Sequence, residues 1–339
     1  MTKLGVLFSV LGVGAGCIPA FAQKQLPNII VMLSDDQGWG DLGFTGNTFV
    51  QTPNIDRIAH EGTILENFYV CPVSSPTRAE FLTGRYHVRS GVNSTTGGGE
   101  RFNLGEKTIA EYFREAGYAT SLFGKWHSGT QYPYHPNARG FEEFYGFCSG
   151  HWGNYWNPVL EHNGEIISGE GFIIDHLTDK ALDYIRDHKE HPFFMFLSYN
   201  TPHSPMQVPD SWWNRVKDRT LSQRATFPEQ EDTTFTKAAL ALAENLDWNI
   251  GRVLSLLHSL DLEQETIVIY FSDNGPNSFR WNGGMKGRKG STDEGGVRSP
   301  FCIRWPGHIR KGAVETQLSG AIDLIPTLLG LAGIEYTPL

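Results

Sequence analysis

The chain has 339 residues, of which 40% are hydrophobic, enough for one large domain or two smaller ones. Only 19% of the residues are charged, and the formal net charge is -9. Because no block of basic residues stands out, we expect no nucleic-acid partner, and an anionic ligand would have to be attracted by a local cluster of positive charge.

The first 22 residues have the pattern of a secretory signal peptide. Lys3 gives the positive start, Leu4–Ile18 is apolar, and Ala20-Phe21-Ala22 is a small-x-small cleavage site. The alternatives are a membrane anchor, for which the apolar run is short, and lipidation at Cys17, whose preceding residues match a lipoprotein site poorly. We therefore expect cleavage after Ala22, a periplasmic or secreted protein, and no membrane span in the mature chain.

Apolar runs that predict strands alternate with helical patterns along the rest of the chain. The predicted strands are Asn28–Leu33, Ala119–Phe123, Phe193–Ser198, Thr266–Phe271 and Phe301–Trp305. The predicted helices are Pro53–Glu61, Lys107–Glu115, Asp175–His188 and Lys237–Leu260. This alternation predicts an α/β fold with a large, mostly parallel sheet between layers of helices. The polar stretch Gln207–Thr234 shows no periodicity and is expected to be a surface excursion.

Three cysteines follow the leader, namely Cys71, Cys148 and Cys302. Their odd number and irregular spacing fit neither a disulfide framework nor a zinc motif. At most one disulfide bridge is possible.

Four predicted strands are followed by ionisable or metal-binding residues. These are Asp35-Asp36, Lys125 with His127, His203, and Asp273-Asn274. In an open α/β sheet, ligands bind outside the carboxyl ends of the strands. Any one of these groups could be an ordinary loop, but four together predict a functional site.

Asp35, Asp36, Asp273 and Asn274 are oxygen ligands, which calcium and magnesium prefer. Taken alone, Asp-Asp after a strand could be a turn or a helix cap, and Asp-Asn-Gly could be a tight turn. Found together at equivalent strand ends, they favour one divalent cation.

Several cations accompany this oxygen set: Arg78, Lys125, His127, His203 and Lys289. They could be separate surface residues, the usual place for lysine and arginine. Their positions at strand ends and in glycine-rich turns instead favour a shared site. A metal with several fixed cations suits a tetrahedral oxyanion, as in sulfuryl or phosphoryl transfer.

The segment around Ser74 predicts a helix that begins near the site. Ser75 can cap this helix with Pro76 at its first position, and Phe81-Leu82 would face the core. Ser74 would then precede a helix N-terminus, which favours an anion, with Arg78 one turn further on. The local pattern alone is simply a capped helix.

Ser74-Ser75-Pro76-Thr77-Arg78, followed by Phe81-Leu82-Thr83-Gly84-Arg85, resembles the signature of type I sulfatases of the alkaline phosphatase superfamily. Gly117–His127 resembles the second signature of that family, and the resemblance runs from about Pro27 to Gly333. It implies an alkaline-phosphatase-like fold. It also implies oxidation of Ser74, rather than Cys71, to formylglycine by a radical-type maturase before export.

The resemblance also implies a role for each residue. Formylglycine at position 74 would hydrate to a diol and join the metal set of Asp35, Asp36, Ser74, Asp273 and Asn274, with Ca²⁺ expected and Mg²⁺ possible. Arg78 and Lys125 would stabilise the diol, and His127 would help to expel sulfate. His203 and Lys289 would bind sulfate and protonate the leaving alcohol oxygen.

The chain departs from the family pattern in two places. Ser128 stands where many relatives have Leu. Relatives also continue into a small C-terminal subdomain with its own antiparallel sheet, whereas this sequence stops at Leu339. We therefore expect residues 26–339 to form the N-terminal catalytic domain, with the C-terminal subdomain truncated.

Two rival functions stay open at this point. One is a metal-dependent phosphoesterase using unmodified Ser74, although such enzymes usually bind two zinc ions through extra His and Asp residues. The other is an inactive, truncated protein that binds sulfated glycans. Predicted substrate contacts, which could equally be core aromatics, are His151, Trp152, Trp156, Arg280 and Trp281. They favour a sulfated saccharide over a steroid or lipid sulfate.

Overall fold

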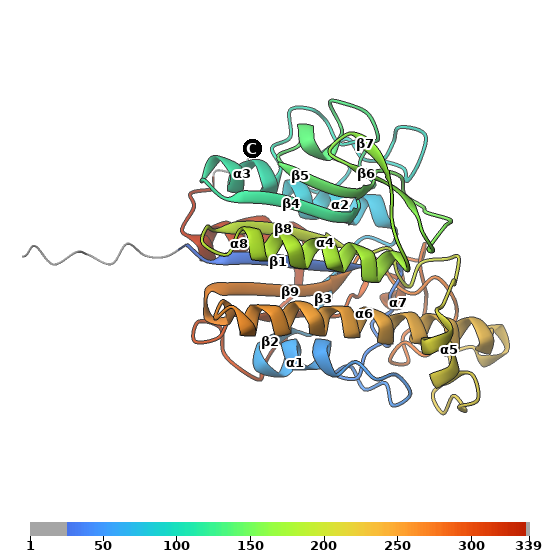
Figure 1. The fold of residues 1–339 in the computed structure, drawn as a ribbon. Helices are drawn as coiled ribbons and strands as arrows, with labels where there is room; N and C mark the ends of the chain where they lie inside the picture. Colours follow the sequence, from blue (N-terminus) through green and yellow to red (C-terminus); the bar gives the residue numbers. More distant parts are fainter. Residues whose placement is uncertain (1–25, 337–339) are drawn as a thin grey trace, which may run out of the picture.

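The computed structural model describes residues 26–336, which form a ten-stranded sheet between two layers of helices (Figure 1). The predicted signal peptide and Cys17 lie outside the described residues. The strands are β1 Asn28–Ser34, β2 Thr63–Leu65, β3 Phe68–Tyr69, β4 Ala119–Lys125, β5 Glu143–Phe147, β6 Val159–His162, β7 Glu165–Ser168, β8 Phe193–Ser198, β9 Thr266–Ser272, β10 Phe301–Arg304, β11 Ala313–Glu315 and β12 Ser319–Gly320. The helices are α1 Pro53–Glu61, α2 Ser74–Thr83, α3 Ile109–Glu115, α4 Ile173–Asp187, α5 Asp210–Val216, α6 Thr233–Ser259, α7 Glu294–Val297 and α8 Leu324–Ala332, with short 3-10 turns Pro136–Ala138, Pro228–Gln230, Glu263–Glu265 and Ala321–Asp323.

The sheet is mixed and parallel at its centre, as predicted. Its strand order is β11-β2-β10-β9-β1-β8-β4-β5-β6-β7, and β3 pairs separately with β12. The five central strands β9, β1, β8, β4 and β5 are all parallel, whereas β10 and β6 run antiparallel to their inner neighbours. The carboxyl ends of the central strands therefore meet along one edge.

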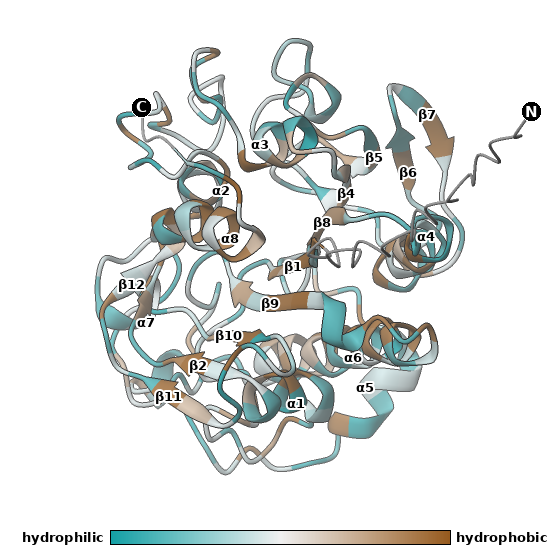
Figure 2. Ribbon diagram, turned by 90° about the vertical axis from the view of Figure 1, so that its left-hand side faces the viewer, coloured by the Kyte–Doolittle hydropathy of each residue, from teal (hydrophilic) through white to brown (hydrophobic). Residues whose placement is uncertain are grey.

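Each face of the sheet carries its own layer of helices. Side chains alternate along β1, so that Ile29, Val31 and Leu33 join one buried cluster and Ile30 and Met32 join the other. The first cluster packs against α2, α3 and α8, and the second against α1, α4 and α6. Figure 2 shows α2 and α8 on one side of the strands and α4 and α6 on the other.

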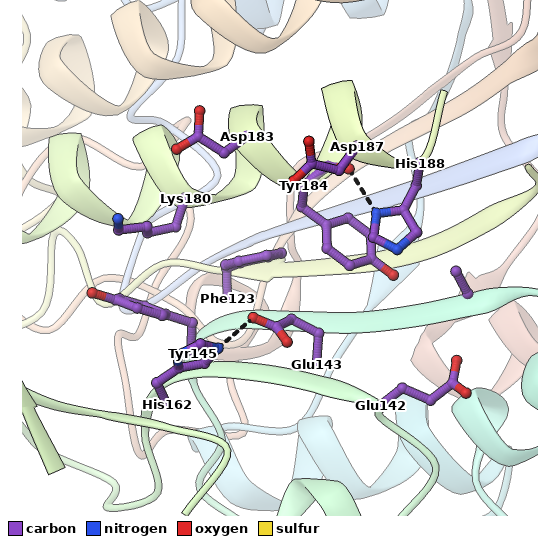
Figure 3. Close-up of a pocket in the computed structure, with 11 residues that line it drawn as sticks. Phe123, Glu142, Glu143, Tyr145, His162, Lys180, Asp183, Tyr184, Asp187 and His188 are labelled. Carbon is purple, nitrogen blue, oxygen red and sulfur yellow. Dashed lines mark hydrogen bonds and ion pairs between the residues drawn. The ribbon is translucent and has the colours of Figure 1, made fainter. Parts of the chain in front are cut away.

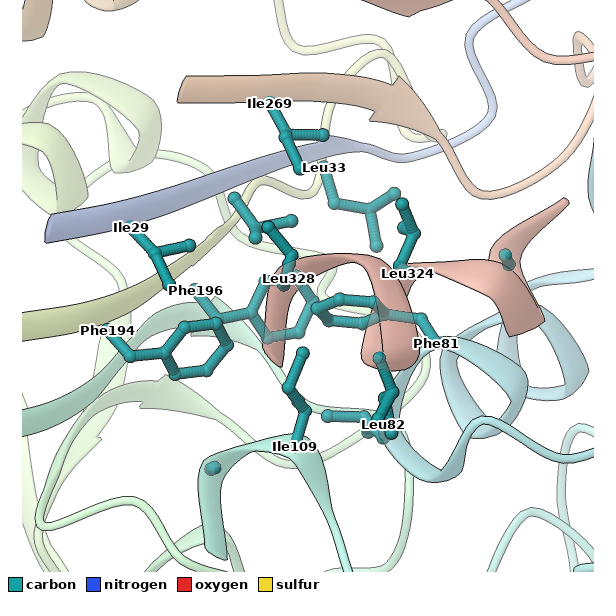
Figure 4. Packing of buried hydrophobic residues seen from close by; sticks show 14 of the residues in the cluster. Ile29, Leu33, Phe81, Leu82, Ile109, Phe194, Phe196, Ile269, Leu324 and Leu328 are labelled. Atoms are coloured by element: carbon teal, nitrogen blue, oxygen red, sulfur yellow. The ribbon is translucent and has the colours of Figure 1, made fainter. Parts of the chain in front are cut away.

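Helix α2 is held in place by its apolar side. Phe81 and Leu82 are fully buried among Ile109 of α3 and Leu324 and Leu328 of α8 (Figure 4). The prediction that Phe81 and Leu82 face the core is confirmed. Burying two such side chains stabilises the position of α2 by roughly 3–6 kcal/mol.

Helix starts follow capping residues more closely than they follow the apolar pattern. Thr108 and Glu111 form a capping box, so α3 begins later than predicted, and Asp232 caps α6. The predicted cap at Ser75 is wrong, because α2 already begins at Ser74 and the Ser75 hydroxyl donates to the Ser94 carbonyl. Within residues 26–336, no helix combines the length and apolar character needed to cross a bilayer.

Several elements lie where no regular structure is expected, among them helix α5 and strands β6 and β7. Helix α5 lies in the polar stretch and packs against α6 through Trp212 and Trp213. Strands β6 and β7 form a hairpin whose turn, Asn163-Gly164, has positive φ angles of 49° and 94°. Asn-Gly favours this turn, so the dipeptide is the signal that could have predicted the hairpin.

Candidate active site

The polar groups predicted at four strand ends meet along one edge of the sheet. Asp35 follows β1, Asp273 follows β9, and their backbones are linked because Asp273 N donates to the Ser34 carbonyl at 3.2 Å. Lys125 ends β4, and its ammonium donates to Asp35 Oδ2 at 2.6 Å. His203 lies beyond β8, with Nε2 3.5 Å from Asp36 Oδ2. The predicted convergence is therefore present.

Four oxygen-bearing side chains form a buried cluster that fits a hard divalent cation. Asp35, Asp36, Asp273 and Asn274 are each at most 1% exposed. Oδ1 of Asp35 and Oδ1 of Asn274 are buried and have no hydrogen-bond partner among the described residues. An unpaired buried oxygen is costly, and carboxylate and amide oxygens are the ligands that calcium and magnesium take. The residues present therefore fit such an ion.

Three cations lie against these carboxylates. Arg78 pairs with Asp273, Lys125 with Asp35, and Lys289 with Asp36 at 2.7 Å. Three positive charges thus balance three negative ones, so a divalent cation would make the cluster net positive and favour an anionic ligand.

The protonation of the pairs follows from burial and charge. Burial alone would raise the pKa of Asp35, but Lys125, His203 and Arg78 outweigh it and hold that pKa well below its usual range. Burial lowers the pKa of Lys125, whereas the carboxylate of Asp36 outweighs burial and raises that of Lys289. Asp35 and Lys289 are therefore held in their charged forms, whereas burial and the neighbouring charge of Asp35 raise the pKa of Asp273.

Ser74 is the first residue of α2, and its hydroxyl is held from two sides. Arg78 Nε donates to Ser74 Oγ at 2.8 Å, and His127 Nδ1 lies 3.1 Å from the same oxygen. Arg78 is fully buried, and it also donates to the Ser198 hydroxyl at 2.5 Å and to the Lys125 carbonyl at 3.2 Å. A rigid cation and an imidazole thus flank one candidate nucleophile.

His127 has a defined tautomer. Its Nε2 lies 2.9 Å from the Thr95 carbonyl, which can only accept, so Nε2 carries the proton and Nδ1 faces Ser74 with a lone pair. Burial, together with the charges of Lys125 and Arg78, lowers the pKa of His127 well below its usual value. The ring is therefore neutral and can accept a proton from residue 74.

The backbone at two site residues is left-handed. Asp36 has φ 63° and His127 has φ 62°, a region that costs free energy for residues other than glycine. Asp36 N donates to Asp273 Oδ1, and His127 N donates to the Cys148 carbonyl, which fixes both turns. A Cβ on Gly150 would lie 2.1 Å from His127 Nε2, so the ring position requires glycine there.

The five predicted substrate contacts have different surroundings. His151 is exposed, with its ring centroid 5.2 Å from that of His203, and Trp156 is 47% exposed. Trp152 stacks on Phe147 and is partly buried, as is Trp281.

The fifth predicted contact, Arg280, requires a correction. Arg280 is 3% exposed, and its guanidinium donates to Asp41 and to the Asp36 carbonyl. Its Nη1 donates to the side chains of Asn277 and Ser278. Arg280 therefore links the turn after β1 to the loop after β9, and its donors are used within the chain.

Two groups of the site escaped prediction. Ser198, at the end of β8, accepts from Arg78, and the same strand-end argument could have identified it. The Thr95 carbonyl fixes the His127 tautomer, but it is a backbone group in a polar loop, for which the sequence carries no signal.

A separate cavity of about 590 Å³ lies over strands β4 and β5 beside helix α4 (Figure 3). Its lining includes Ala119 and Glu143, the first residues of β4 and β5, whereas the site follows the carboxyl ends of the strands. None of the predicted site residues lines it. The cavity is therefore distinct from the cluster around Ser74.

Comparisons with known proteins find relatives by sequence and by structure. The model of a family described as Sulfatase matches residues 27–334. Human N-acetylgalactosamine-6-sulfatase is 33% identical over 95% of this chain, and mouse steryl-sulfatase is 28% identical over 94%. The chain spans 64% of the length of each of these relatives. The crystal structure of Ps i-CgsB in complex with k-i-k-neocarrahexaose is 32% identical with TM-score 0.81, covering 92% of this chain and 73% of that one.

Proposed function

Because the chain belongs to the sulfatase family, we propose that it hydrolyses sulfate esters with residue 74 as the nucleophile. One observation carries the proposal: the oxygen of Ser74 is held between the guanidinium of Arg78 and the neutral ring of His127. The buried oxygens of the candidate cation site and three cations lie at the same edge of the sheet. This arrangement suits attack on an anionic tetrahedral centre.

Formylglycine made from Ser74 would add water to give a diol, whose second hydroxyl, on the carbon that bears the nucleophile, is one that serine lacks. His127 Nδ1 would accept a proton from residue 74, since its Nε2–H is committed to the Thr95 carbonyl. Arg78 Nε would donate to the oxygen of residue 74 and stabilise negative charge on it. The chain's own residues thus provide both the proton acceptor and the charge stabilisation.

The remaining cations suit the sulfate group. A Ca²⁺ ion held by Asp35, Asp36, residue 74, Asp273 and Asn274 would supply further positive charge beside the nucleophile. Lys125, at the end of β4, donates to Asp35, and Lys289, in the loop before α7, donates to Asp36. His203 Nδ1 donates to the Ser204 carbonyl at 2.6 Å, so the second ring proton of the imidazolium form, on Nε2, is the one that would pass to a leaving alcohol, which leaves the ring neutral.

For the substrate we propose a sulfated saccharide. Support comes from the names of two relatives, which refer to N-acetylgalactosamine and to a bound neocarrahexaose. In this chain, the exposed His151 lies beside His203, and the exposed Trp156 and partly buried Trp152 follow on the same loop, so this loop offers polar and aromatic contacts to a sugar ring. A panel of sulfated mono- and disaccharides with a steroid sulfate, assayed for released sulfate, tests this. Activity confined to the steroid would contradict it.

The sulfatase activity itself is tested on protein co-expressed with a radical-type maturase. We expect release of inorganic sulfate from an aryl sulfate, its loss in Ser74→Ala, and its retention in the matched control Ser75→Ala, whose hydroxyl faces Ser94. Turnover of a phosphate monoester by unmodified Ser74 would instead favour a phosphoesterase. Binding of sulfated glycan without turnover by modified protein would favour a binding protein.

We also propose that the protein is periplasmic or secreted, with its leader removed after Ala22. Maturation of Ser74 would then precede export. Mass analysis of the mature protein from a bacterial host tests this, with a start at Gln23 as the expected result. A lipid-modified Cys17 would contradict cleavage after Ala22, and an unprocessed cytoplasmic chain would contradict export.

A further inference from the structure

A second group of metal-ligating side chains surrounds helix α2, away from the oxygen cluster. Cys71 precedes the helix, Glu80 lies within it and His87 follows it, and their ligand atoms lie within 4.8 Å of one another. Cys71 is 8% exposed and Glu80 is 7% exposed. We propose that these three side chains hold a zinc ion, independently of the proposed function.

The ligand types select the metal. A thiolate, an imidazole and a carboxylate are all zinc ligands, whereas calcium and magnesium avoid sulfur. In a tetrahedral site with Zn–S of about 2.3 Å and Zn–N of about 2.1 Å, sulfur and nitrogen lie about 3.6 Å apart. Since the ligand atoms lie within 4.8 Å of one another, each pair needs to close by at most roughly 1.2–1.4 Å. Small side-chain rotations supply such a movement, and the thiol proton leaves to solvent on binding.

The tautomer of His87 is the one that a metal requires. Its Nδ1 lies 3.1 Å from the Val92 carbonyl, which can only accept, so Nδ1 carries the proton and Nε2 keeps a lone pair. A backbone carbonyl in this position is the usual outer partner of a metal-binding histidine. Glu80 Oε1 accepts from His87 N at 3.2 Å, which holds the carboxylate close to the ring.

A similar trio elsewhere in the chain lacks this feature. His135, Cys148 and Glu161 also bring three ligand atoms within 4.8 Å. Here, however, His135 Nδ1 accepts from Asn137 N, so Nε2 must carry the proton that it donates to Glu161 at 2.5 Å. That ring has no free lone pair for a metal. The contrast favours the site at Cys71 and makes Cys148 a matched control.

A cavity gives the proposed site an entry path. It has a volume of about 550 Å³ and is lined by Cys71 and Glu80, with Tyr86 and Leu318 exposed beside them. Water in this cavity can supply the fourth ligand that three protein ligands leave open. The spacing of the three residues matches no zinc motif because one ligand is a carboxylate and the three are spread over the ends and middle of a helix.

Bound zinc would join the two ends of α2, the helix that carries Ser74 at its first turn. It would therefore stabilise the helix without contacting the reacting atoms. Ligands that bind only the native state raise its stability by mass action. The expected readout is thermal stability and metal content, which do not depend on catalysis.

The test uses the full chain saturated with Ca²⁺, so that the oxygen cluster is filled, and then supplied with Zn²⁺ or Co²⁺. We expect one bound equivalent, a thiolate-to-cobalt charge-transfer absorption, and a higher midpoint of thermal unfolding with zinc. Cys71→Ser and His87→Gln should weaken binding at least tenfold, while Cys148→Ser should bind as the parent does. His87 is only partly buried, so His87→Gln provides a test even if the buried Cys71→Ser variant fails to fold.

Three results would overturn the proposal. The first is the absence of zinc binding to the Ca²⁺-saturated parent chain. The second is equal zinc binding by the parent, Cys71→Ser and His87→Gln, and the third is loss of zinc binding in Cys148→Ser instead.

Discussion

Replacing Arg78 by lysine keeps the charge but removes the geometry that holds the candidate nucleophile. The guanidinium donates to four acceptors: Ser74 Oγ, the Lys125 carbonyl, Ser198 Oγ and Asp273 Oδ2. A lysine ammonium on a flexible stem can keep the pair with Asp273 but cannot span the rest. Leaving the Lys125 carbonyl and Ser198 Oγ without this donor should lower the free energy of unfolding by about 2–6 kcal/mol. Losing the charge-assisted contact to Ser74, about 1.5–3 kcal/mol, corresponds to roughly 10–150-fold in turnover.

The assay for Arg78→Lys combines urea unfolding with turnover of an aryl sulfate by matured protein. Ser198→Ala is the matched control, because it removes one acceptor and leaves the contact between Arg78 and Ser74 in place. We expect the control to keep turnover within a few-fold of the parent. Parent-like stability and turnover in Arg78→Lys would refute the role given to the guanidinium.

Three further predictions concern pH, packing and the metal. Burial raises the pKa of Asp247 from its usual 3.8 to about 7, so the native state holds a proton that the unfolded chain has lost, and stability should fall as pH rises from about 4 to about 7. In Asp247→Asn, the side-chain carbonyl oxygen can still accept the N–H groups at the start of α1. The free energy of unfolding in urea should therefore depend less on pH in this variant, and an unchanged pH dependence would contradict the prediction. Gly150→Ala should displace His127 and lower turnover by about 100-fold or more. Gly153→Ala is the control, because a Cβ there has no atom within 4 Å, and it should not lower turnover. Equal turnover in the two variants would argue against the role of His127. Removing bound metal with a chelator should abolish turnover and lower the midpoint of thermal unfolding, and adding Ca²⁺ should restore both. Activity that survives complete metal removal would show that turnover does not need the cation.

The central sheet and most of the site could be predicted from the sequence because both follow from short-range patterns. Buried parallel strands are continuous apolar runs, and their carboxyl ends must meet at one edge. That rule alone predicts that Asp35, Lys125, His203 and Asp273 lie together, as the structure shows. Position 74 needed the family resemblance in addition, because a serine at a helix start is locally unremarkable.

Other features depend on contacts that no local pattern carries. Arg280 looks like a surface cation in an aromatic loop, but it pairs with Asp41 across the turn after β1. The Thr95 carbonyl that sets the His127 tautomer is a backbone group from a distant loop. The short strand β2 owes its place to pairing with β10 and β11 rather than to its own composition.

The mass of one tryptic peptide shows whether Ser74 is converted to formylglycine. Cleavage after Arg57 and Arg78 gives the peptide Ile58–Arg78, which contains residue 74. In protein that turns over sulfate esters after co-expression with a radical-type maturase, we expect this peptide to be lighter by the mass of two hydrogens, with the change at Ser74. An unmodified Ser74 in fully active protein would contradict it.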